Sequence, residues 1–265
     1  MNLFFKVKRA IACKFLKKKV SLNLSKPIIS FAFDDIPDSA ITNGARILSE
    51  YGYNGTFYVS LGLADNHNKN KSYFDHSKLK QLVADGAELA CHTADHIALY
   101  RSGRRKILNN LKKNQEKINQ LLPGYEFKNF SYPSGQQTFR SKWILKKQFR
   151  SARGVKAGMH KKEMDLYNLH ANEMGDKLTL QLAVALIDEA IENNAWLIFY
   201  THEVEDNPSA YGCTAEFFET VVKYCYKKNV EVLTVNKALD KILLGKRSDK
   251  NMQYKQRLNS NLVPV

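Results

Sequence analysis

Short apolar runs and longer amphipathic segments alternate along the chain. The runs are rich in β-branched and aromatic residues and predict strands, whereas apolar residues that recur once per helical turn predict helices. Strands are expected at residues 27–33, 55–60, 88–92, 127–132, 196–202 and 230–235. Helices are expected at residues 38–51, 75–83, 103–122, 141–149, 177–193, 215–228 and 236–244. Residues 151–175 show no clear pattern.

This alternation predicts an α/β fold with a parallel sheet, because parallel strands are joined by helical crossovers. Residues 196–202 (WLIFYTH) are apolar almost throughout, as expected for a parallel strand buried on both faces. Six strand–helix units in succession favour a barrel over an open sheet, and a length of 265 residues suits one barrel domain.

The chain carries a formal net charge of +15, with basic clusters at residues 1–20, 101–117 and 246–257. The clusters fit either solvated helix faces and chain ends or attraction to a polyanion. Residues 3–16 place four apolar side chains among lysines on one helical face, which is typical of a helix on an anionic membrane surface: Phe4, Val7, Ile11 and Phe15. Nucleic acid is a disfavoured partner, because no known binding motif accompanies the charge.

The N-terminal sequence does not fit a secretory signal peptide, because Lys14 interrupts its apolar run and no cleavage site follows. The cysteines lie far apart, which is typical of reduced thiols: Cys13, Cys91, Cys213 and Cys225. We therefore predict a cytoplasmic protein, with peripheral contact to the inner face of the membrane as a further expectation. The sequence does not indicate an oligomeric state.

Ionisable side chains stand where predicted strands end. Asp34 and Asp35 follow the first strand, His92 ends the third, and His202 ends the fifth. Because the carboxyl ends of parallel strands meet at one rim of a barrel, we expect these groups to share a site with His96. Taken singly, an aspartate pair often forms a turn or a helix cap, and a histidine often satisfies backbone groups. Their joint placement favours a chemical role.

The spacing of His92 and His96 allows both imidazoles to bind one metal ion, and a carboxylate would complete a set with open positions for water and substrate. Such an ion lowers the pKa of bound water to about 7 and polarises a carbonyl group. Adjacent residues of a strand point to opposite sides, so Asp34 and Asp35 are expected to differ in role, one as ligand and one as general base. His202 is then a candidate general acid for a departing amine.

Four segments match the motifs of a known family in order and spacing: SFAFDD (30–35), GAELACHTADH (86–96), FSYPSG (130–135) and LIFYTHEV (197–204). On these residues the chain resembles the polysaccharide deacetylases, also called the NodB-homology domain or carbohydrate esterase family 4. The resemblance implies a distorted (β/α)7 TIM-like barrel. It divides the chain into a basic N-terminal extension (1–26), a barrel domain (27–245) and a basic C-terminal tail (246–265).

The resemblance also implies a reaction, the metal-dependent removal of an acetyl group from an N-acetylated sugar. Transferred motif by motif, it makes Asp34 the general base and His202 the general acid. It makes Asp35, His92 and His96 the ligands of a divalent ion, usually zinc.

Neighbouring residues receive supporting roles from the same resemblance. Thr93 is expected to brace the loop between the two histidines by hydrogen bonding. Tyr132, Pro133 and Ser134 are expected at the substrate, with a backbone N–H near Ser134 at the oxyanion.

Three features depart from the family pattern. Ile36 replaces the usual glycine after the aspartates, and Ser131 stands where many members have an arginine that orients the base. The fourth motif is replaced by residues 152–174, in which Arg153 and His170 are candidates for contacts with an uncommon substrate.

The favoured function is therefore deacetylation of an N-acetylhexosamine in a bacterial surface glycan or in its lipid- or nucleotide-linked precursor. The predicted cytoplasmic location favours the precursor. The alternatives are an amidase for a non-sugar C–N bond and a catalytically silent module that binds glycan or anionic lipid.

Overall fold

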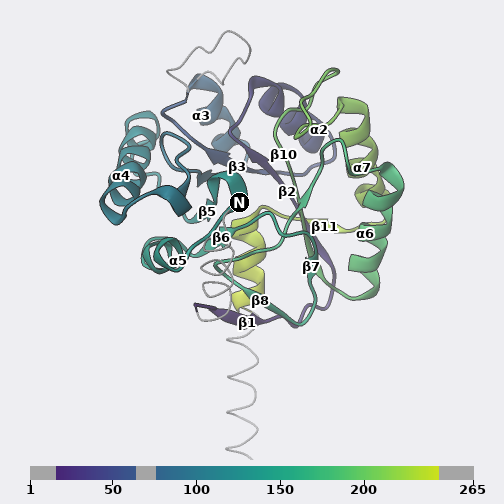
Figure 1. Ribbon diagram of the computed structural model, residues 1–265. Helices are drawn as coiled ribbons and strands as arrows, with labels where there is room; N and C mark the ends of the chain where they lie inside the picture. Colours follow the sequence, from purple (N-terminus) through teal and green to yellow (C-terminus); the bar gives the residue numbers. More distant parts are fainter. Residues whose placement is uncertain (1–15, 64–75, 245–265) are drawn as a thin grey trace, which may run out of the picture.

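The computed structural model describes residues 16–63 and 76–244, which form a curled, mainly parallel sheet surrounded by helices, with β7 antiparallel to β10 at one edge (Figure 1). The order of the strands is β6-β5-β4-β3-β2-β10-β7, with β11 beside β2 and β9 beside β10. The central strands are β2 (Ile28–Asp34), β3 (Thr56–Val59), β4 (Glu88–Cys91), β5 (Asn129–Ser131), β6 (Ser151–Arg153), β10 (Trp196–Thr201) and β11 (Glu231–Val232). They pair in parallel, as predicted.

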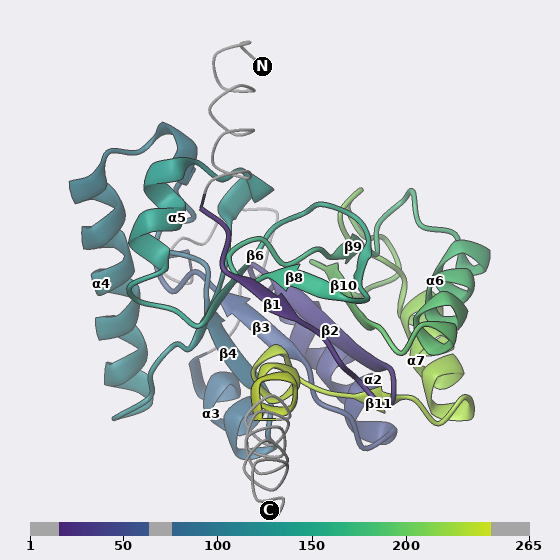
Figure 2. The same cartoon turned by 90° about the horizontal axis from the view of Figure 1, so that it is seen from below.

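Helices cover the sheet on opposite flanks, α4 and α5 on one and α6 and α7 on the other (Figures 1 and 2). The α-helices are α2 (Arg46–Glu50), α3 (His76–Ala84), α4 (Arg104–Leu121), α5 (Phe139–Leu145), α6 (Leu180–Glu192) and α7 (Ala215–Lys227), and residues 235–244 are also helical. The short helices are η1 (Ala40–Ala45), η2 (Leu99–Arg101) and η3 (Pro133–Gly135). Where one helix was expected at residues 38–51, the π-helix η1 precedes α2. The predicted α/β barrel class is confirmed.

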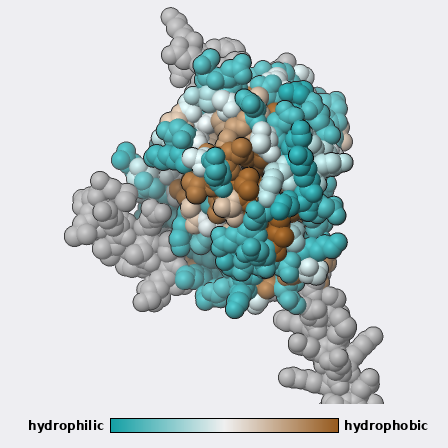
Figure 3. Space-filling model, turned by 90° about the vertical axis from the view of Figure 1, so that its right-hand side faces the viewer, coloured by the Kyte–Doolittle hydropathy of each residue, from teal (hydrophilic) through white to brown (hydrophobic). Residues whose placement is uncertain are grey.

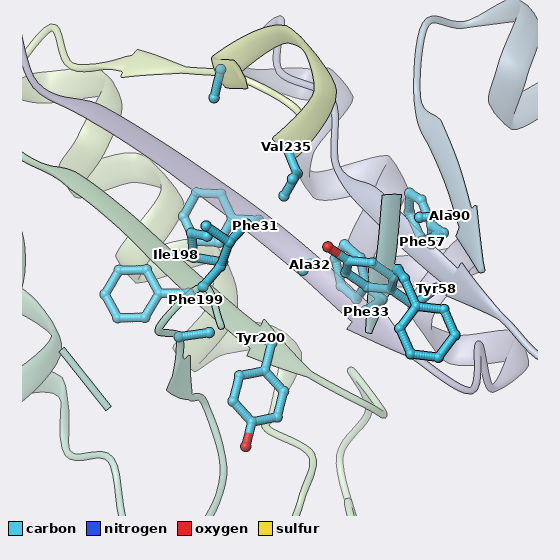
Figure 4. Close-up of a cluster of buried hydrophobic side chains, with 14 of the residues drawn as sticks. Phe31, Ala32, Phe33, Phe57, Tyr58, Ala90, Ile198, Phe199, Tyr200 and Val235 are labelled. Atoms are coloured by element: carbon cyan, nitrogen blue, oxygen red, sulfur yellow. The ribbon is translucent and has the colours of Figure 1, made fainter. Parts of the chain in front are cut away.

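Strand β2 is the centre of the core and is buried along its whole length. The ring of Phe33 stacks on that of Phe57 in β3 with 4.6 Å between centroids, and the ring of Phe31 lies 5.8 Å from that of Phe199 in β10 (Figure 4). Burying one such side chain contributes roughly 1.5–3 kcal/mol. This packing fixes the strand, and with it the position of the two aspartates at its carboxyl end.

Residues 151–175, for which no element was predicted, contain β6 and three further short strands. These are β7 (Met159–His160), β8 (Glu163–Asp165) and β9 (Asn172–Glu173). Leu169 N–H donates to the Ala152 carbonyl of β6 at 3.0 Å, and Met174 N–H donates to the Tyr200 carbonyl of β10 at 2.7 Å. The segment therefore bridges the two sides of the curled sheet. Strand β1 (Lys19–Ser21), which falls in the predicted basic extension, pairs with β8.

A buried polar network ties together the amino ends of the strands. The carboxylate of Glu88 accepts hydrogen bonds from Thr56 Oγ1 at 3.0 Å, Asn129 Nδ2 at 2.6 Å and the N–H of Asn236 at 2.8 Å. Burial raises the pKa of Glu88. Thr56, Glu88 and Asn129 are the first residues of β3, β4 and β5, and Asn236 lies at the start of the C-terminal helix. The network therefore lies at the end of the barrel opposite to the predicted site and has a structural role.

The side of the molecule that carries α6 and α7 shows an apolar patch bordered by hydrophilic residues (Figure 3). On α6, Leu182 is 53% exposed. Among the residues that the structure describes, no helix has the length and apolarity needed to cross a membrane. The predicted membrane-surface side chains from Phe4 to Phe15 and the basic tail at 246–265 lie outside the described residues and stay predictions.

His160 is expected to make the stability of the protein depend on pH. Its ring packs against Trp196 with 5.6 Å between centroids, and its Nε2 accepts the N–H of His170 at 3.1 Å. Burial lowers the pKa of His160 to about 3. Below a pH of about 6.5 the unfolded chain therefore binds a proton that the folded protein excludes. The free energy of unfolding decreases as the pH is lowered through this range.

Urea unfolding at pH 7 and pH 5 measures this effect. The wild type should lose about 2 kcal/mol more than His160→Asn between these two pH values, because only the wild type must keep this imidazole neutral on folding. Equal losses in the two proteins would show that His160 titrates alike in both states.

Candidate active site

The site begins at a sharp bend after β2. Asp34 ends the strand, and Asp35 and Ile36 both adopt left-handed backbone conformations, with φ of 60° and 48°. Ile36 N–H donates to the Asp34 carbonyl at 2.7 Å, closing a three-residue turn. A β-branched residue rarely adopts a positive φ, so this conformation costs free energy that packing of the fully buried Ile36 side chain offsets. Adjacent residues of a straight strand point to opposite sides, and the bend brings the carboxylates of Asp34 and Asp35 to the same site.

Asp35, His92 and His96 converge on one point. The Oδ1 atom of Asp35 lies 3.7 Å from Nε2 of His92 and 3.6 Å from Nε2 of His96. Ligand atoms that share an ion at about 2.0–2.2 Å are roughly 3–4 Å apart. Asp35 Oδ1 is buried without a hydrogen-bond partner, which is costly unless a cation satisfies it. The three residues therefore fit a divalent metal ion.

Contacts at Nδ1 fix the orientation of the His92 ring. Its Nδ1 contacts the backbone carbonyl of Ser131 at 3.0 Å and also the Ser131 hydroxyl, so Nε2 is left to face Asp35. Burial lowers the pKa of His92 to about 4, which favours the neutral imidazole that a metal requires. The neighbouring Cys91 points the other way, because its Sγ accepts a hydrogen bond from Asn114 Nδ2 of α4 at 3.3 Å.

The loop between the two histidines is braced from both sides. Thr93 and His96 have positive φ values of 64° and 46°. Thr93 Oγ1 accepts the N–H of Ile97 at 3.1 Å, and Asn110 Oδ1 of α4 accepts the N–H of Ala94 at 2.8 Å. These hydrogen bonds hold the strained loop, so Thr93 occupies a position suited to the bracing role that the resemblance implied.

Asp34 pairs with Arg153, which was predicted to contact the substrate. Nη2 of Arg153, at the end of β6, lies 2.5 Å from both carboxylate oxygens of Asp34. Burial alone would raise the pKa of Asp34, but Arg153, followed by His92 and His202, lowers it to about 2. Asp34 is therefore ionised throughout the neutral range.

This pairing corrects the expectation that Arg153 contacts the substrate, because the side chain is 1% exposed. Its guanidinium lies between the rings of Tyr58 and Tyr200, at 5.0 Å and 4.4 Å from their centroids. It holds Asp34 in the way that the resemblance assigned to an arginine at the position of Ser131. The serine at position 131 indicated that another residue must pair with Asp34. The sequence did not show which arginine does so.

Of the three residues of the FSYPSG segment (130–135) that were predicted at the substrate, two are buried and one is exposed. Tyr132 is buried, and its hydroxyl donates to the Tyr167 carbonyl at 3.1 Å. Pro133 is also buried, whereas Ser134 is exposed and has a φ of 58°. The structure thus leaves Ser134 as the member of the predicted trio that a substrate can reach directly.

His202 follows directly after β10 and is partly exposed. Its Nδ1 lies 3.4 Å from the Tyr211 carbonyl, and its effect on the pKa of Asp34 places it in electrostatic reach of that carboxylate. His170 lies elsewhere, lining a cavity of about 280 Å³ with Lys156 and Met159. The structure therefore brings His202 to the rim and leaves His170 outside it.

Known proteins resemble part of this sequence and share its fold. The sequence model of the polysaccharide deacetylase family matches residues 21–149, which carry the first three motifs. Similar solved structures include the Xyl-CE4 domain of a multidomain xylanase from the hindgut metagenome of Trinervitermes trinervoides, at 18% identity and a TM-score of 0.58, covering 82% of this chain and 91% of that one. Curated protein sequences gave no match.

Two structures from Bacillus subtilis are also similar. The peptidoglycan deacetylase PdaC has 16% identity and a TM-score of 0.56, with 88% of this chain and 99% of that one covered. PdaA, a family 4 carbohydrate esterase, has 13% identity and a TM-score of 0.58, with 89% of each chain covered. At these identities the structures establish the fold.

The fold and the family match together define a hydrolase on a distorted α/β barrel that acts on carbon–nitrogen bonds. Residues 21–149 match the sequence model of the polysaccharide deacetylase family, as the motifs predicted. The family implies an acetylated glycan as substrate.

Proposed function

We propose that this protein is a metal-dependent deacetylase that hydrolyses the N-acetyl group of an amino sugar in a polysaccharide or in its lipid- or nucleotide-linked precursor. The observation that carries the proposal is the buried, unpartnered Oδ1 of Asp35, which faces Nε2 of both His92 and His96. Two further groups accompany this triad: Asp34, a base held by Arg153, and the partly exposed His202. Together they supply the groups that metal-assisted amide hydrolysis uses.

The ion at the triad is proposed to be zinc, because two imidazoles and one carboxylate with open positions are typical of catalytic zinc. When bound, a divalent cation supplies polarisation of the amide carbonyl and favours ionisation of water. Asp35, His92 and His96 hold it there.

The remaining residues move and place protons. Asp34, ionised and fixed by Arg153, accepts a proton from the attacking water. His202 donates a proton to the departing amine, and the Tyr211 carbonyl beside Nδ1 leaves Nε2 to face the substrate. The backbone N–H of Ser134 is our candidate donor to the oxyanion, with Tyr132 and Pro133 supporting that turn.

Acetate release from a panel of amides tests this proposal. Zinc-loaded protein should release acetate from N-acetylglucosamine oligomers, and Asp34→Asn should lower kcat by about 10²–10⁴-fold, the range that general base catalysis supplies. Acetate from non-sugar amides alone would favour the amidase alternative. Stoichiometric zinc without acetate from any amide would favour a silent binding module and overturn the proposal.

We further propose that the protein works in the cytoplasm, with its basic N-terminal segment at the inner face of the membrane. The isolated cysteines support a reducing compartment, and three of them are free and buried: Cys91, Cys213 and Cys225. Fractionation of cells that express the full chain checks both points.

A further inference from the structure

Tyr211 is a large aromatic side chain that stands on the surface beside the proposed general acid. Its side chain is 59% exposed, and its ring centroid lies 5.7 Å from that of His202 with an angle of 55° between the rings. The N–H of His202 also donates to the Tyr211 carbonyl at 3.2 Å. An exposed aromatic ring is thus fixed next to the group that protonates the leaving amine.

The loop that presents Tyr211 is held by internal hydrogen bonds. Glu203 is 3% exposed and its Oε2 accepts the hydroxyl of Ser209 at 2.7 Å. Cys213 N–H donates to the Glu203 carbonyl at 2.9 Å, and Asp176 N–H donates to the Ala210 carbonyl at 3.2 Å. Because these contacts fix the backbone around Tyr211, the loop is formed before a ligand arrives, which lowers the entropy cost of binding.

A comparably exposed tyrosine elsewhere is differently placed. Tyr226 on α7 is 57% exposed, and its ring packs edge-on against Tyr51 with 5.4 Å between centroids. Its neighbours are therefore other aromatic side chains, while the neighbour of Tyr211 is His202. Tyr226 provides a matched control for surface aromatic area.

The chemistry of an amino sugar places its ring near this tyrosine. The leaving nitrogen of an N-acetylhexosamine is bonded directly to the pyranose ring, so a histidine that protonates it lies within a few ångströms of that ring. A pyranose has one face rich in C–H groups, which are weakly positive and apolar. The face of an aromatic ring is electrostatically negative, and covering the apolar face of the sugar removes it from water, which also favours binding.

We propose that Tyr211 is a sugar-binding residue whose ring stacks on the C–H face of a hexopyranose and selects cyclic amino sugars over linear amides. The inference rests on the proposed function and names the feature of the substrate that the site recognises. The tyrosine ring supplies the stacking contact, while its backbone carbonyl orients His202, so a side-chain substitution separates the two roles.

Paired kinetics test this role with Tyr211→Ala, Tyr211→Phe and the control Tyr226→Ala. We expect Tyr211→Ala to lower kcat/KM for N-acetylglucosamine oligomers about tenfold, mainly through a higher KM, because stacking on the sugar ring stabilises the bound substrate and the transition state alike. Tyr211→Phe should retain most of the activity, and Tyr226→Ala should match the wild type. The loss with 4-nitrophenyl acetate, which has no pyranose ring, should be clearly smaller.

Two results would overturn the inference: no loss with the oligomer, or equal losses with both substrates, which would indicate a general disturbance of the loop. Failure of the proposed function has a different signature, since the wild type would then release no acetate from any amide. In that case, calorimetry with the same oligomer still decides the role of Tyr211. Weaker binding to Tyr211→Ala than to the wild type supports it, and equal or absent binding to both refutes it.

Discussion

His92→Ala is expected to remove both the bound metal ion and the release of acetate. His92 is 1% exposed, and its Nε2 is one of two imidazole nitrogens that face Asp35 Oδ1. Without it, His96 and Asp35 form a two-ligand site too weak to retain zinc. We expect the metal content to fall from about one ion per chain to near zero, and kcat/KM to fall by about 10³-fold or more. Elemental analysis and acetate release measure the two effects on one preparation.

His160→Asn is the matched control, because His160 is a buried histidine outside the rim. Its metal content and kcat/KM should equal those of the wild type at pH 7. A His92→Ala protein that keeps one ion per chain, or more than about a tenth of wild-type kcat/KM, would contradict the assignment of His92 as a ligand.

Arg153→Met is expected to destabilise the protein and to inactivate it. The side chains of Arg153 and Asp34 are 1% and 5% exposed, so the substitution leaves a carboxylate buried without its counter-charge. Breaking a buried pair in this way costs about 3–5 kcal/mol. The pKa of Asp34 should rise, because burial then acts on it without the guanidinium. Denaturant unfolding and acetate release measure the two losses.

Two further variants separate this ion pair from general packing effects. Arg153→Met combined with Asp34→Asn should recover part of the stability, since neither charge remains to be buried. Arg150→Met breaks the pair of Arg150 and Asp240, whose side chains are 31% and 48% exposed, and should cost less than about 1 kcal/mol. Equal costs for the two arginine variants would show that the Asp34 contact is no more than a surface ion pair.

The framework of this fold could be predicted because its central strands carry continuous apolar runs. Strands β2 and β10 are buried along their whole lengths, and such runs predict parallel strands without further information. The carboxyl ends of these strands also located Asp34, Asp35 and His202, because strand direction alone determines which residues reach the rim.

The support of the site could not be predicted in the same way. Strands β6 to β9 span two or three residues each, too few for a periodic pattern, and their pairing depends on distant partners. Arg153 lies at the end of β6, so its pairing with Asp34 became visible with the sheet order. The left-handed conformations of Asp35 and Ile36 were equally hidden, because a β-branched residue such as Ile36 rarely adopts a positive φ and an aspartate does so at a minority of its positions.

The central claim is that one cation sits between Asp35, His92 and His96. Anomalous diffraction at the zinc edge, from crystals of the full chain grown with zinc, tests it most directly. An anomalous peak is expected about 2.0–2.2 Å from the Asp35 carboxylate and from Nε2 of both histidines. A peak at His160 and His170 in place of this one, or no peak at the triad at saturating zinc, would contradict it.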